Sequence, residues 1–157
     1  MPNATLRSST AKLDTLQQRT MVGTVVLDAT YSVPANTVVG HEIVFARVPT
    51  SARITGLTRI YNDALGASVT LSVGAKAVGG NFTSSTTAIS TAFAVATANV
   101  IGTLPFTDHV NAGRLLWDLL GLTADPGGFA DICGYTAGAT TTASAQDVTM
   151  SLAYVID

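Results

Sequence analysis

An alternation of apolar with polar or small side chains between residues 41 and 78 constrains the fold of this chain more than any other feature. It is clearest at residues 68–78, where Val69, Leu71 and Val73 alternate with Thr, Ser and Gly. Successive side chains of a β-strand point to opposite faces, so a period of two is typical of antiparallel strands with one buried face. The pattern predicts three consecutive strands, at residues 43–46, 52–62 and 68–78.

Turn-forming residues separate these strands. Pro49 presets φ for a reversal at residues 48–51, and Asn62 and Asp63 can bond to their own backbone at residues 62–66. Both breaks can therefore reverse the chain. Further extended segments are predicted at residues 21–33, 37–46, 82–103 (one or two strands), 129–135 and 145–156, with a loop at 138–144. Seven or eight short strands predict an all-β fold, an antiparallel β-sandwich of the jelly-roll type with one short helix.

The low charge of the chain indicates hidden surface. Only 11% of its 157 residues are charged, although 47% are hydrophobic, whereas about 25% are charged in an average soluble protein. A soluble monomer needs charge to avoid association, so we expect much of the surface to lie against other copies or another protein. The net charge of −2 and the scattered Lys and Arg residues disfavour nucleic-acid binding.

The location expected from the sequence is soluble and intracellular at synthesis. Cys133 is the only cysteine, so the chain has no internal disulfide and suits a reducing compartment. The first 20 residues contain no apolar stretch of the signal-peptide kind. No apolar run approaches the roughly 20 residues that span a membrane.

Two segments have alternative interpretations. Residues 1–20 are polar and form either a frayed terminus or an arm that orders on a neighbouring subunit, ahead of a single domain at 21–157. Residues 82–103 are rich in Thr, Ser and Ala, and form either a buried strand or a surface for close approach of another subunit. If both segments make contacts, the candidate interface residues there are Leu6, Leu13, Leu16, Thr86, Ile89, Thr91, Phe93 and Val95.

One helix is predicted after Pro105. Asp108 suits the N-cap, leucines follow at helical spacing to Leu120, and Gly121 suits the position just past the end. Trp117 falls outside the apolar stripe. It is either a partly buried anchor or a further interface residue.

No constellation of catalytic residues is present. His41 and Glu42 begin like a zinc-protease H-E-x-x-H motif, but Phe45 stands where the second histidine is required. With two histidines and one glutamate, the chain cannot supply a three-histidine metal site. Cys133 lies in an apolar run typical of a core thiol rather than a nucleophile. Scattered aspartates leave a paired-carboxylate glycosidase formally open, but sugar sites favour aromatic platforms and the chain is 6% aromatic. We expect a non-enzymatic protein without cofactor or metal.

Four segments resemble the small capsid decoration (cement) proteins of tailed-bacteriophage heads. They are residues 48–54, 62–74, 125–129 and the closing strand at 148–156. The resemblance implies a jelly-roll-like sandwich that binds the outside of an assembled shell of major capsid protein, as a homotrimer, on a virion assembled in the host cytoplasm. The alternatives are another virion component, such as a head-fibre base, tail or neck protein, and a ligand- or carbohydrate-binding sandwich module.

Overall fold

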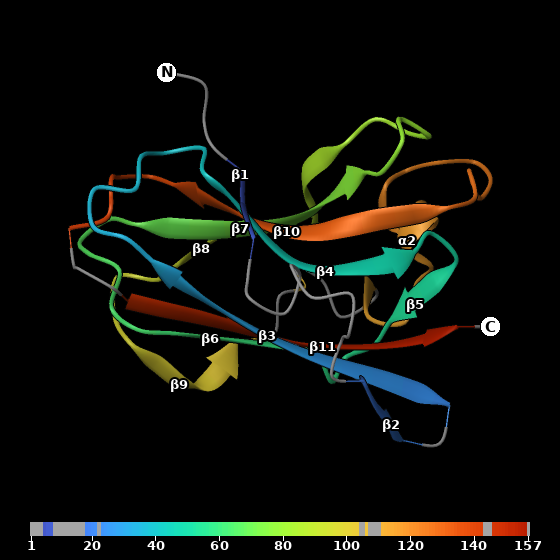
Figure 1. Ribbon diagram of the computed structural model, residues 1–157, viewed down its shortest axis with the longest axis horizontal. Coiled ribbons are helices and arrows are strands. Elements are labelled where there is room, and N and C mark those ends of the chain that lie inside the picture. The colour runs from blue at the N-terminus through green and yellow to red at the C-terminus, as the bar shows by residue number, and fades with distance from the viewer. Residues whose placement is uncertain are drawn as a thin grey trace.

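Two β-sheets pack face to face in the computed structural model (Figure 1), which describes residues 5–7, 18–21, 23–103, 106, 111–142 and 146–156. The first sheet has the order β1-β4-β10-β7-β8 and the second the order β2-β3-β11-β6-β9. β1 runs parallel to β4, and the other pairs are antiparallel. The strands of the first sheet are β1 (Thr5–Arg7), β4 (Glu42–Pro49), β7 (Thr70–Ala77), β8 (Ser85–Ala94) and β10 (Phe129–Ala137). Those of the second are β2 (Gln18–Met21), β3 (Thr24–Val33), β5 (Ala52–Ile54), β6 (Arg59–Asn62), β9 (Asn99–Thr103) and β11 (Gln146–Ile156).

The order of the strands is that of a jelly roll. From β3 to β11 the chain crosses between the sheets at every connection except the turn from β5 to β6 and the hairpin from β7 to β8. Eight strands therefore form two four-stranded layers, β3-β11-β6-β9 and β4-β10-β7-β8, as in the double-sheet jelly-roll architecture. The prediction of an antiparallel jelly-roll sandwich is confirmed.

The core lies between the two sheets. Leu27 of β3 and Leu152 of β11 face Phe45 of β4 and Leu71 of β7, and all four are almost completely buried. These inward positions are apolar positions of the alternating pattern in the sequence. Each such side chain contributes roughly 1.5–3 kcal/mol through removal of its apolar surface from water.

The predicted strand at residues 52–62 is interrupted, so the prediction of one continuous strand is wrong. The hydroxyl groups of Thr55 and Thr58 both donate to the carbonyl of Ala153, at 3.1 and 3.2 Å. This pair of bonds holds a turn between β5 and β6. The predicted inward face survives, because Ile54 and Ile60 remain fully buried on either side of the turn.

The strand at residues 68–78 is buried on both faces rather than one. Ser72 and Gly74, predicted on its open face, are also buried in β7. A Cβ added at Gly74 would lie 2.6 Å from the carbonyl carbon of Thr86. The backbone of β8 thus occupies the space that a side chain would fill.

The predicted helix is shorter than expected, since the described α-helix α2 covers only Leu116–Leu119. Gly113 has a φ of +88°, and Leu115 is extended and forms an isolated bridge with Arg53. These two conformations exclude a helix that continues through residues 113–115, and Asp108 lies outside the described residues. Gly121, with a φ of +74°, follows the end of the helix as predicted.

Short strands from the predicted N-terminal arm extend both sheets. β1 adds to β4 at one edge of the first sheet, and β2 adds to β3 at the corresponding edge of the second. Leu6 lies in β1, whereas Leu13 and Leu16 lie outside the described residues. In the described parts of the chain no helix is long and apolar enough to cross a membrane.

Candidate functional site

Cys133 does not have the environment of a nucleophile. Its side chain is fully buried on the outer side of β10, and this burial, with the nearby charge of Glu42, raises its pKa to about 12. A nucleophilic cysteine needs the opposite, a thiolate stabilised by positive charge. Within the described ranges, no group of three His, Cys, Asp or Glu residues could hold a metal ion.

Among the described residues, two ion pairs lie on the outer face of the first sheet. Arg47 of β4 binds the buried carboxylate of Asp131 through two hydrogen bonds, of 2.7 and 3.1 Å. Lys76 of β7 reaches across β10 to Glu42 of β4, at 2.9 Å. The pairing register places Cys133 between Lys76 and Glu42. These carboxylates therefore hold strands of the first sheet together, which is a structural role.

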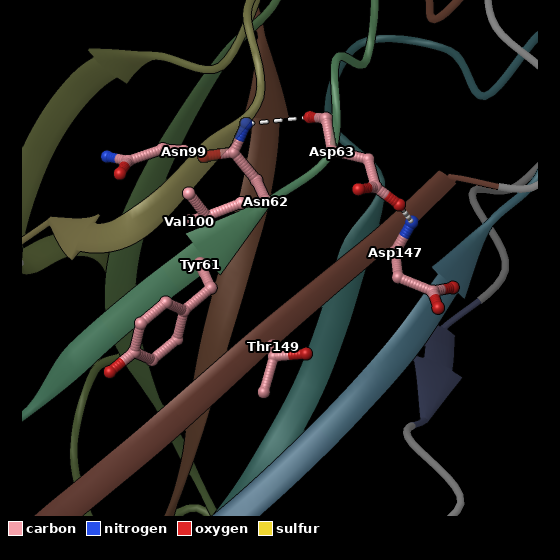
Figure 2. Close-up of a pocket in the computed structure, with 7 residues that line it drawn as sticks. All are labelled: Tyr61, Asn62, Asp63, Asn99, Val100, Asp147 and Thr149. Atoms are coloured by element: carbon pink, nitrogen blue, oxygen red, sulfur yellow. Dashed lines mark hydrogen bonds between the residues drawn. The ribbon is translucent and has the colours of Figure 1, made fainter.

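A shallow, open groove of about 250 Å³ lies where β6, β9 and β11 meet (Figure 2). The amide of Asn62 donates to the carbonyls of Asp63 and Thr97, at 2.7 and 3.0 Å, and the Asp63 carboxylate accepts the backbone N–H of Asp147, at 3.0 Å. The ring of Tyr61 points away from the two carboxylates. The polar groups of the groove thus mainly join strand ends. Its lining consists of Tyr61, Asn62, Asp63, Asn99, Val100, Asp147 and Thr149.

The residues predicted as an interface differ in their exposure. Thr86 and Thr91 are exposed on β8, the outermost described strand of the first sheet. Phe93 packs half-buried against the core, and Trp117 is half-buried in α2. Ile89 and Val95 are fully buried in the core of this same chain. Any contact with a partner at this edge of the first sheet would therefore use Thr86, Thr91 and the backbone of β8. The side chains of Ile89 and Val95 would not take part.

The sequence patterns did not single out an apolar loop at residues 34–41. These residues were predicted to be partly extended, but β4 begins only at Glu42 and the loop leaves Val38 and Val39 exposed. The signal available in the sequence for a loop was the spacing of Pro34, Asn36 and Gly40 around two adjacent valines, since such residues mark turns. Asn36 and Gly40 indeed have positive φ angles.

Comparison with known proteins identifies a solved structure of similar fold. No protein-family profile matches the chain, and neither does any curated protein sequence. Among solved structures, the chain is similar to one in the structure "Capsid of Ralstonia phage GP4", with a TM-score of 0.67. The chain shares its fold with part of a phage capsid. The alignment covers 98% of this chain and 99% of the other, at 16% sequence identity, so the shared feature is the whole jelly roll rather than a local motif.

Proposed function

We propose that this chain is a structural protein of a tailed-phage virion that decorates the outside of the assembled capsid shell. The observation that carries the proposal is the end-to-end match of its jelly roll to a chain of a phage capsid. The resemblance of residues 48–54, 62–74, 125–129 and 148–156 to capsid decoration proteins supports the finer assignment. A non-enzymatic role agrees with the buried, high-pKa thiol of Cys133 and with carboxylates that bond within the fold.

The proposed mechanism is stabilisation of the shell by binding. A protein that contacts several capsid subunits at once binds the assembled shell and not the separate subunits. Binding to one state only shifts the equilibrium toward that state by mass action. Several attachment points on one oligomer raise the overall affinity above that of a single contact.

Self-association is the second part of the proposal. β8 carries no charged residue and no proline over Ser85–Ala94, and it pairs with β7 on one side. Charged residues and prolines are the usual means by which proteins protect sheet edges from pairing. An edge that lacks these charges and prolines therefore suits contact between copies in a homotrimer. The N-terminal arm at residues 1–20 is proposed to reach a neighbouring copy or the shell.

A sedimentation experiment tests the function. The purified chain is mixed either with empty expanded shells of the phage that encodes it or with unassembled major capsid protein from that phage. We expect the chain to pellet with the shells in a saturable amount and not to associate with the subunits. Equal binding to both forms, or none to shells, would refute decoration and favour another virion location.

A further inference from the structure

We propose that the end of the sandwich bearing Val38 and Val39 is the surface that docks onto the capsid shell. This inference rests on the proposed decorating function and specifies its contact. Four loops form this end, at the left of Figure 1, through residues 34–41, 64–69, 95–98 and 138–142. We call them the docking end.

Hydrogen bonds hold the valine loop in one conformation. The N–H of Thr37 donates to the hydroxyl of Thr141, at 2.9 Å, and both threonine hydroxyls donate to the carbonyl of Pro34. On the other side of the valines, the hydroxyl of Thr136 donates to the carbonyl of Val38, at 3.0 Å. The three threonines are each at most 5% exposed, so water does not compete for these bonds.

The other loops continue this bonding across the docking end. The N–H of Thr142 donates to the carbonyl of Leu65, and the N–H of Leu65 donates to that of Val95, at 3.2 and 3.1 Å. The four loops are therefore one connected surface. Val38 and Val39 project from it with 44% and 48% exposure. Exposed apolar side chains on a preorganised backbone lose little conformational entropy when they bind.

The charge distribution distinguishes the two ends of the sandwich. Residues 34–40, 64–69, 95–98 and 138–142 contain no Asp, Glu, Lys or Arg, and the exposed carboxylates of Asp63 and Asp147 stand at the margin. The opposite end, near α2, carries the Arg114–Asp118 ion pair and the exposed Asp125. An uncharged end can be buried without leaving an unpaired charge in the contact.

The size of the docking end favours a shell over a second copy. Its exposed residues are fewer than the roughly 20–30 per side of a standard stable interface. One such contact would hold an end-to-end dimer weakly. In the proposed trimer, the copies contact one another through the edge of β8. The three docking ends remain free to bind the shell together. The partner surface that fits is a recess with an apolar centre and a basic rim facing Asp63 and Asp147.

Binding curves of variants on empty shells test the inference. Val38→Asp/Val39→Asp places charge at the contact, and Val38→Thr/Val39→Thr keeps the shape but replaces methyl groups by hydroxyl groups. Leu57→Asp is the matched control, because Leu57 is 64% exposed in the turn between β5 and β6, away from the docking end. We expect at least tenfold weaker binding for the Asp pair, a smaller loss for the Thr pair, and less than a twofold change for Leu57→Asp, with unchanged melting temperatures.

The outcomes separate this inference from the proposed function. Equal binding by the wild type and the Asp pair would refute the docking end but leave decoration intact. Failure of the wild-type chain to bind shells would refute both. If the Asp pair binds shells normally but forms smaller oligomers in light scattering, then the docking end contacts another copy and the inference is wrong.

Discussion

Gly74 at the centre of β7 should tolerate no side chain. An added Cβ would collide with the carbonyl oxygen of Ser85 and lie 2.6 and 2.7 Å from backbone carbons of Thr86. Contacts this close do not occur in folded proteins, so Gly74→Ala must displace something. The obstacle is the backbone of β8, which cannot rotate away as a flexible side chain could.

The cost of Gly74→Ala follows from this geometry. Forcing an extra methyl group into a packed site costs typically 1–3 kcal/mol. Because relief requires β8 to move away from β7, we expect a loss of stability at the upper end, about 3 kcal/mol. For a chain of this length, 1 kcal/mol corresponds to roughly 2–4 °C in Tm. Gly74→Ala should therefore melt about 6–12 °C below the wild type.

Two further Gly→Ala variants make the comparison specific. A Cβ at Gly134 would lie 2.8 Å from Cε2 of Phe45, a side-chain atom that can shift, so Gly134→Ala should cost less. A Cβ at Gly56 would have its nearest contact at 3.7 Å, to Ala112, so Gly56→Ala should be neutral or stabilising by about 0.4–1 kcal/mol. Urea unfolding of the three variants measures this order. If Gly74→Ala is no more destabilising than Gly56→Ala, then β8 does not approach β7 as described.

Three other substitutions test the Arg47–Asp131 ion pair, the buried thiol of Cys133 and the hydrogen bond between Thr37 and Thr141. Arg47→Ala removes the two hydrogen bonds that Arg47 donates to the buried Asp131 carboxylate and should cost about 1–2 kcal/mol, since Arg47 itself is half exposed. A double-mutant cycle with Asp131→Asn in urea isolates the pair, and zero coupling would contradict it. Because burial raises the pKa of Cys133 from 9.0 to about 12, the thiolate forms more readily in the unfolded chain. The contribution of Cys133 to stability should thus be complete below pH 9 and decline between pH 9 and 12, by up to about 1.4 kcal/mol per pH unit. The difference between wild-type and Cys133→Ala unfolding curves shows this decline, and a difference independent of pH would refute it. Thr141→Val removes the hydroxyl group that accepts the backbone N–H of Thr37. It should lower the free energy of unfolding in urea by about 1–3 kcal/mol. No loss would show that this bond does not hold the loop.

The sequence predicts the strands of this protein better than their connections. The inward positions of Val69, Leu71 and Val73 follow from a period of two, but this period did not show that the other face of the strand is buried as well. The turn between β5 and β6 was missed because it keeps Ile54 and Ile60 on the inner face. Its cause is the carbonyl of Ala153, about a hundred residues away along the chain.

The described helix is shorter than predicted for a similar reason. The leucines from Leu115 to Leu120 have helical spacing, but Leu115 pairs with Arg53 of β5 instead of entering the helix. This pairing depends on the tertiary arrangement, which outweighs local helix preference. Which positions of the Thr/Ala-rich segment are buried was equally hard to foresee. Ile89 and Val95 belong to the core, and only the sheet order shows that β8 lies at an edge.

The surfaces were the least predictable part. Val38 and Val39 look like strand residues in the sequence, and their exposure depends on bonds from Thr136 and Thr141, which lie in β10 and the loop after it. Low total charge, by contrast, was visible at once. It predicted that some surface is covered but not which one.

A reconstruction of decorated shells by electron cryomicroscopy tests the central claim most directly. Empty expanded shells of the phage that encodes this chain are imaged with and without the purified protein. Decoration predicts additional density on the outer surface at symmetry-related positions, into which the sandwich fits with the Val38–Val39 end toward the shell. Additional density inside the shell or only at the tail vertex, or shells without additional density at saturating protein, would contradict it.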